Sequence, residues 1–184
     1  MSFNGNSNMQ GLPGYSLGVK VLNRVAQLSI SDLDASALTA NLFTPANLTS
    51  APTLARRKRG DQTFPQGMIA GQVVAVRATG KVAPFRGTAG ESIIGIAVND
   101  SIGQAFEAAS GLASGKATYI CGAGSVVKVD VFEGDISAYV PGAKVYADVD
   151  TGLLTVTAPA SGDNAVIGVV LNNEDLNVTI QMRL

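Results

Sequence analysis

Residues 71–99 read GQVVAVRATGKVAPFRGTAGESIIGIAVN, and residues 142–172 read GAKVYADVDTGLLTVTAPASGDNAVIGVVLN. In both stretches an alternating apolar run ends in a Thr-Gly turn, and a short strand, a polar loop and an Ile-Gly strand follow. With a spacing of about 70 residues and two copies, the repeat does not suit a stacked solenoid, which needs at least about three units. The repeat instead predicts a mainly β fold, a small barrel or sandwich with internal two-fold pseudo-symmetry.

The rest of the chain divides into a β-rich body and an N-terminal arm. Nine strands are predicted at regular spacing, which is typical of a barrel or sandwich: 73–76, 81–83, 93–98, 117–121, 126–132, 144–147, 153–157, 165–171 and 176–182. Residues 64–184 therefore form the body. Residues 1–63 form an extended arm and linker, because residues 1–18 are too rich in Gly, Asn and Ser to order alone, and residues 44–53 carry two prolines and no periodicity. Within the arm, Ser31 followed by two acids predicts a short helix over residues 31–42.

Charge is distributed unevenly between these parts. The whole chain has a formal net charge of −1, but residues 1–60 hold six basic and two acidic residues, while residues 61–184 hold seven basic and twelve acidic ones. The strongest feature is the run Arg56, Arg57, Lys58 and Arg59. Such a run suits phosphates, an acidic protein surface or plain solvation. The near-neutral total argues against a nucleic-acid footprint over the whole surface.

Several kinds of chemistry are missing from the composition. The chain has no histidine, so His-based nucleophilic triads, His-ligated zinc and a His general base are excluded. Cys121 is the single cysteine, which excludes an intrachain disulfide and predicts a buried apolar side chain. The run Asp148-Val149-Asp150-Thr151-Gly152 lacks the later ligands of a calcium loop and predicts a hairpin turn. We expect no catalytic, cofactor-binding or metal-binding residues, no small-molecule substrate and no enzyme activity.

No membrane association is expected either. The N-terminus is polar and uncharged, and no stretch reaches the roughly 18 apolar residues of a membrane span. The sequence therefore predicts a protein made and used in the cytosol, or assembled there into something larger.

The body resembles the head decoration, or capsid cement, proteins of tailed bacteriophages. The similarity covers about residues 66–184. It lies in Gly71-Gln72-Val73-Val74, Thr79-Gly80-Lys81-Val82-Ala83-Pro84 and Ile94-Gly95-Ile96-Ala97, and again in Val140-Pro141-Gly142-Ala143-Lys144-Val145-Tyr146, Thr151-Gly152-Leu153-Leu154-Thr155 and Ile167-Gly168-Val169. The acid that this family carries after the first glycine is replaced by Gln72 in one copy and by Ala143-Lys144 in the other.

The resemblance implies a non-enzymatic, homotrimeric structural protein of the virion. Such a protein is made in the host cytoplasm, binds the outer surface of an expanded capsid and bridges neighbouring subunits of the major capsid protein, with no cofactor. Residues 56–59 are then candidate capsid contacts, because an extended basic arm suits an acidic neighbouring surface.

Three alternatives belong to other classes. In the first, the chain is a minor tail or vertex component of the virion, and copy number per particle is the test. A non-viral carrier or carbohydrate-binding β module is the second alternative, but neither Lys81 nor Lys128 has the setting of a lipoyl-type lysine. The third and weakest is a hydrolase that uses a pair of aspartates.

Overall fold

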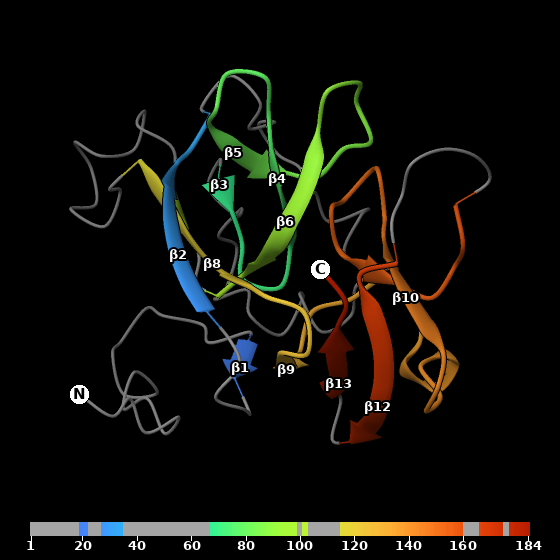
Figure 1. Cartoon of the computed structure of the whole chain (residues 1–184). Coiled ribbons are helices and arrows are strands. Elements are labelled where there is room, and N and C mark those ends of the chain that lie inside the picture. The colour runs from blue at the N-terminus through green and yellow to red at the C-terminus, as the bar shows by residue number, and fades with distance from the viewer. Residues whose placement is uncertain are drawn as a thin grey trace, which may run out of the picture.

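The computed structural model describes residues 19–21, 27–34, 67–98, 101–102, 115–159, 166–174 and 177–184. Segment 1–18, most of the predicted arm 1–63 and the basic run 56–59 lie outside the described residues. The described part is mainly β and forms two antiparallel sheets in a sandwich-like arrangement (Figure 1). This confirms the predicted fold class.

The first sheet has the strand order β2-β8-β6-β4-β5. Its strands are β2 (Gln27–Asp32), β4 (Val73–Val76), β5 (Val82–Pro84), β6 (Ser92–Ala97) and β8 (Lys116–Cys121). The second sheet has the order β1-β9-β13-β12-β10-β11 and consists of β1 (Val19–Val21), β9 (Val126–Val129), β10 (Lys144–Ala147), β11 (Leu154–Thr155), β12 (Gly168–Glu174) and β13 (Asn177–Met182). A small pair, β3 (Gly67–Met68) with β7 (Ser101–Ile102), and a 3-10 helix, Ile136–Ala138, complete the described elements.

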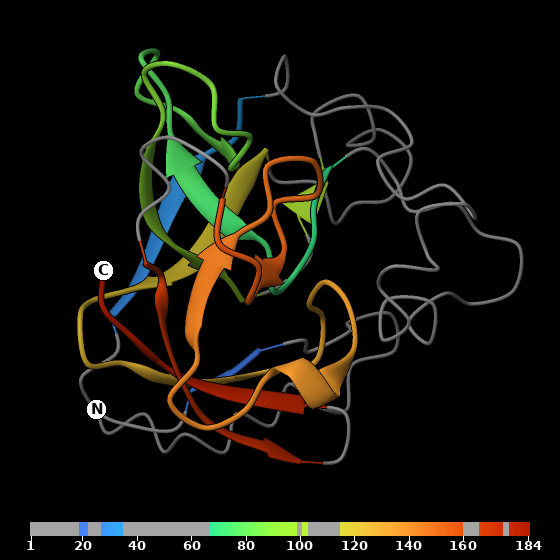
Figure 2. The ribbon, with the colours of Figure 1, turned by 90° about the vertical axis from the view of Figure 1, so that its right-hand side faces the viewer.

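The two sheets are two copies of one topology. We call β2, β4, β5, β6 and β8 the first unit, and β9 to β13 the second unit. In each unit the first strand pairs with the last, and the order is first-last-fourth-second-third. A parallel bridge then brings the end of the first strand to the third strand, Leu33 to Val82 in one unit and Phe132 to Leu154 in the other. Figure 2 shows the units one above the other.

Individual hydrogen bonds repeat with the topology. Gly71 N donates to Ala97 O at 2.9 Å, and Gly142 N donates to Val170 O at 2.8 Å. Both glycines, and also Gly80 and Gly152 of the two Thr-Gly turns, have a positive φ that favours glycine. The repeated sequence therefore gives the same turn geometry twice, as predicted.

Each unit encloses a small core of matching side chains. Seven buried positions of the first unit correspond by strand register to seven of the second. The pairs are Leu33 with Phe132, Met68 with Tyr139, Val74 with Val145, Val82 with Leu154, Ala97 with Val170, Ala117 with Val178, and Tyr119 with Ile180. The second core is the larger, and its Phe132 and Tyr139 rings pack at a centroid distance of 4.8 Å. The Tyr139 hydroxyl lies 2.7 Å from Glu133 O and 2.8 Å from Leu154 O, so the polar atom of this buried ring is satisfied.

The Ile-Gly strands explain a second feature of the repeat. A Cβ on Gly95 would lie 2.2 Å from Ile120 O, and a Cβ on Gly168 would lie 2.5 Å from Gln181 O. Ile120 and Gln181 are matching residues of the last strands, so both units bring the fourth and fifth strands together at the same point. Glycine is needed here for close backbone approach rather than for an unusual φ.

The nine predicted strands all exist, and their ends agree with the prediction to within three residues. The predicted helix over 31–42 is wrong at its start, because Ser31 and Asp32 are in β2 and pair with Ala117 and Lys116; residues 35–42 lie outside the described part. Since β1 and β2 precede residue 64, the sheets include segments that were assigned to the arm. Cys121 is only partly buried, with its thiol 3.4 Å from Ser29 Oγ.

We expect Gly95→Ala and Gly168→Ala each to lower the free energy of unfolding by roughly 3 kcal/mol, because the methyl group would push apart two paired strands. Urea titration followed by circular dichroism measures this loss. Gly90→Ala is the control: its Cβ would meet no atom within 4 Å, so only the positive φ of 84° is strained, at about 1 kcal/mol. Equal losses at Gly95 and Gly90 would contradict the close-approach explanation.

Candidate functional site

The two units contact each other at the turn that follows β10, and we call this contact the joint. The Gln72 side chain is fully buried and bridges the joint, since Oε1 accepts from Ile69 N at 2.8 Å and Nε2 donates to Thr151 O at 2.7 Å. Next to it, Val73 N donates to Gly152 O at 2.7 Å. Two neighbouring carbonyls of the second unit are thus bound by two donors of the first.

An apolar contact surrounds these hydrogen bonds. Val73, Ile96 and Ile120 lie side by side on the outer face of the first sheet, and each is completely buried in the core of the second unit. Their counterparts on the outer face of the second sheet are Lys144, Val169 and Gln181, which are exposed or partly exposed. The joint is therefore one-directional: the outer face of the first unit rests on the second, but not the reverse.

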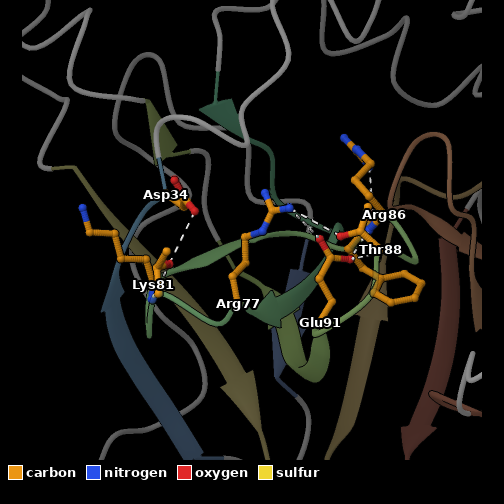
Figure 3. Close-up of polar contacts among 8 residues, drawn as sticks. Asp34, Arg77, Lys81, Arg86, Thr88 and Glu91 are labelled. Atoms are coloured by element: carbon orange, nitrogen blue, oxygen red, sulfur yellow. Dashed lines mark hydrogen bonds and ion pairs between the residues drawn. The ribbon is translucent and has the colours of Figure 1, made fainter.

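The turn of the first unit that matches this joint is open. Residues 77–80 correspond to residues 148–152, and residues 77–79 line a cleft of about 400 Å³ together with Asp34 and residues 89–91. A Cβ on Gly80 would meet nothing within 4 Å, whereas one on Gly152 would lie 2.9 Å from Arg86 Nη1. Figure 3 shows the charged side chains that converge on this part of the first unit.

Glu91 is the most deeply placed charge of the cleft, with a side chain only 1% exposed. Its Oε2 accepts from Arg86 N at 2.9 Å and from Thr88 N at 3.2 Å. Its Oε1 has no hydrogen-bond partner but lies 3.5 Å from the Arg77 guanidinium, which is 28% exposed. The carboxylate therefore holds the loop before β6 and anchors Arg77 at the cleft wall (Figure 3).

The opposite wall is built from Asp34 and Thr79. Asp34 is 8% exposed, and its backbone N donates to Val82 O at 2.8 Å, which ties the end of the first strand to β5. Thr79 Oγ1 approaches Asp34 Oδ2 at 3.5 Å, and the Lys81 side chain extends nearby (Figure 3). The cleft thus presents two carboxylates, one guanidinium and one hydroxyl, a set that suits a polar or charged partner.

Arg86 lies between the cleft and the joint. Burial lowers its pKa, and the negative charges of Glu91, Asp148 and Asp150 oppose that shift. Its Nη1 donates to Phe85 O at 3.0 Å. Asp148 is itself occupied by its own turn, since Oδ1 accepts from Asp150 N, Thr151 N and Thr151 Oγ1. This confirms the predicted hairpin turn at residues 148–152.

Apolar side chains are exposed in two other places. Leu28 and Ile30 of β2 are 60% and 66% exposed, while Ser29 and Ser31, which alternate with them, are partly buried. Val140 and Leu171 of the second unit are 54% and 44% exposed. At the end of β2 the Lys116 ammonium donates to Asp32 Oδ1 at 2.9 Å and lowers the pKa of that exposed carboxyl.

The predicted capsid contacts Arg56, Arg57, Lys58 and Arg59 lie outside the described residues, so the structure does not place them. The cleft residues Asp34 and Glu91 were missed by sequence reasoning. The Thr79-Gly80 turn was predicted, but nothing in its spacing indicates that residues 34 and 91 lie beside it. Among the described residues, no three His, Cys, Asp or Glu side chains gather closely enough to hold a metal ion.

A scan against models of known protein families gives no match, and searches of curated proteins and of solved structures give none. Within the described ranges, no helix has the length and apolar character needed to cross a membrane.

We expect Gln72→Met to lower the free energy of unfolding by about 2–3 kcal/mol, because Ile69 N and Thr151 O would stay buried without a partner. Chemical denaturation measures the change. Gln181→Met is the matched control, since the Gln181 side chain is exposed on the outer face of the second unit and its replacement should leave the midpoint nearly unchanged. A midpoint for Gln72→Met equal to that of the control would refute the bridging role.

Glu91 gives a second stability prediction. Glu91→Gln keeps one oxygen for the two backbone donors and loses the charge opposite Arg77, so we expect a loss of about 1 kcal/mol, and about 3 kcal/mol for Glu91→Ala. Thermal and urea midpoints report both. Asp32→Asn removes an exposed ion pair and should have little effect. If Glu91→Ala were as mild as Asp32→Asn, the carboxylate would not hold the loop.

Proposed function

We propose that this chain is a structural protein of a tailed-bacteriophage virion that binds the outer surface of the expanded capsid. It stabilises the shell by bridging neighbouring subunits of the major capsid protein, and it acts without a catalytic step or cofactor. Its contribution is mechanical: each contact that spans two capsid subunits must be broken before they separate.

The resemblance between both repeats and capsid decoration proteins is the observation that carries this proposal. The residues that carry it are those on which the fold depends. Gly80 and Gly152 form the matching turns, and Gly95 and Gly168 allow the close approach of the last two strands. The resemblance thus includes positions where the backbone restricts the residue, by a positive φ at Gly80 and Gly152 and by close packing at Gly95 and Gly168.

The composition of the whole chain supports the same function. Only 15% of the chain is charged, and 46% is apolar, which suits lasting burial in an assembly. The exposed Leu28 and Ile30 on β2 give the first unit an apolar surface. In this proposal Arg56, Arg57, Lys58 and Arg59 anchor the arm on acidic capsid surface, and the chains act as a homotrimer.

Co-sedimentation with expanded, undecorated capsids from the same source tests the proposal. We expect saturable binding of the full chain in a fixed ratio to the major capsid protein. Reversing the four charges of residues 56–59 to glutamate should weaken binding about tenfold or more, and added salt should weaken the wild type, because exposed charge pairs are screened.

The truncation used in this experiment must stop before Val19. Deleting residues 1–60 would remove β1 and β2 and leave β8 and β9 each with one unpaired edge, so lost binding could not be told apart from unfolding. A chain lacking residues 1–18 keeps every described strand. If neither the full chain nor this truncation bound capsids, the decoration function would be refuted and a tail or vertex position favoured. Unchanged binding after charge reversal would remove the basic anchor alone.

A further inference from the structure

We propose that the chain associates head to tail with a second copy of itself. The outer face of the second unit in one copy, marked by Val140, Lys144 and Leu171, would rest on the open cleft of the first unit in the next. The proposed contact between copies would have the same arrangement as the joint between the two units of one chain.

The internal joint is heterologous, because an outer face of one unit meets a turn of the other. Two units related in this way carry two outer faces and two turns, and one joint uses only one of each. The unused pair is the outer face of the second unit and the turn at residues 77–80 of the first. They correspond to the outer face of the first unit and the turn at residues 148–152 of the second, which contact each other in the joint.

The outer face of the second unit, which takes no part in the joint, carries exposed apolar side chains. Val140 and Leu171, which are 54% and 44% exposed, correspond to Ile69 and Val98 of the first unit. Ile69 is 4% exposed, and Val98 is partly buried against the core that spans the joint. The side chains that the first unit covers at its joint are therefore matched by uncovered apolar side chains on the second.

The unused turn has room for a partner. In the second unit, Gly152 is covered by Phe85 and Arg86, with Phe85 O 3.2 Å from the position of a Cβ. In the first unit, Gly80 has open space in the same direction, and the cleft of about 400 Å³ lies beside it. A second copy that approached as the first unit approaches the second would bring the backbone of Lys144 to Gly80, as Val73 meets Gly152.

The charges of the two surfaces are complementary. Lys144 stands where the first unit has the buried Val73, and its side chain is exposed. The cleft that would receive it is lined by two acids and one base, Asp34, Glu91 and Arg77, and Glu91 is buried against Arg77. A lysine cannot replace valine in a dry joint, but it can meet a wet cleft whose lining has a formal charge of −1. The intermolecular contact is therefore expected to be weaker than the internal joint, reversible and sensitive to salt.

This contact names surfaces for the self-association included in the proposed function, but it does not rest on capsid binding. It is measured on the purified chain alone, so its failure is distinguishable from a failure to bind capsids. Head-to-tail contacts close into a ring when the rotation between copies allows it, and otherwise extend into a filament.

Sedimentation velocity of the full-length chain over a wide concentration range is the first experiment. We expect the wild type to associate as concentration rises, and Leu171→Asp and Lys144→Glu each to raise the dissociation constant about tenfold or more. Leu28→Asp is the matched control, since Leu28 is even more exposed than Leu171 but lies on neither surface, and it should associate like the wild type. All three positions are on the surface, and circular dichroism verifies that each variant folds.

A charge exchange then tests the pairing of the two surfaces. Thr79→Lys places a cation at the cleft opposite Lys144, so it should weaken association, and adding Lys144→Glu should restore it to within a few-fold of the wild type. A wild type that stays monomeric at every concentration overturns the proposal. Association that survives Leu171→Asp and Lys144→Glu but is lost in Leu28→Asp also overturns it, as does a double variant that remains as weak as the single ones.

Discussion

The contact of Gln72 and Val73 with the carbonyls of Thr151 and Gly152 determines how the rest of this molecule is arranged. It fixes which face of the first sheet is turned towards the second unit, and so which side chains are removed from water. The apolar side chains around it belong to one cluster that spans both units. This contact leaves little freedom of register, because sliding the units would break the bonds of Gln72 Nε2 to Thr151 O and of Val73 N to Gly152 O and leave buried polar groups unsatisfied.

Most strands could be predicted because the repeat shows the same local pattern twice, and each copy supports the strand assignment in the other. Strand β2 was missed, although Leu28 and Ile30 alternate with serines, because its polar side chains face inward and its apolar ones outward. Ser31 bonds the Tyr119 hydroxyl of β8 instead of capping a helix. Local sequence cannot distinguish these two roles of a serine, since the partner lies 88 residues away.

The charged cleft illustrates a different limit. Its turn was evident from Thr79 and Gly80, but Asp34 and Glu91 reach it from separate strand ends brought together by the sheet.

The structure gives a physical reason for Gln72, which stands where the resembling family has an acid: a carboxylate could not donate to Thr151 O. The four cations of residues 56–59 are known from composition alone, since they lie outside the described residues. The proposed capsid binding therefore draws on sequence resemblance, whereas the proposed self-contact draws on geometry.

The two cores differ in which unit supplies their side chains, and this difference affects how the chain folds during synthesis. The interior of the first unit is closed by its own residues, from Leu33 to Tyr119, whereas the interior of the second is completed by side chains such as Val73 and Ile120. The unit that is synthesised first thus has an inner core that uses no side chain of the other, although Val73, Ile96 and Ile120 on its outer face are covered only when the second unit forms. Because domains generally fold as units and the N-terminal one folds first during synthesis, the emerging second half meets a finished template on which its strands can condense.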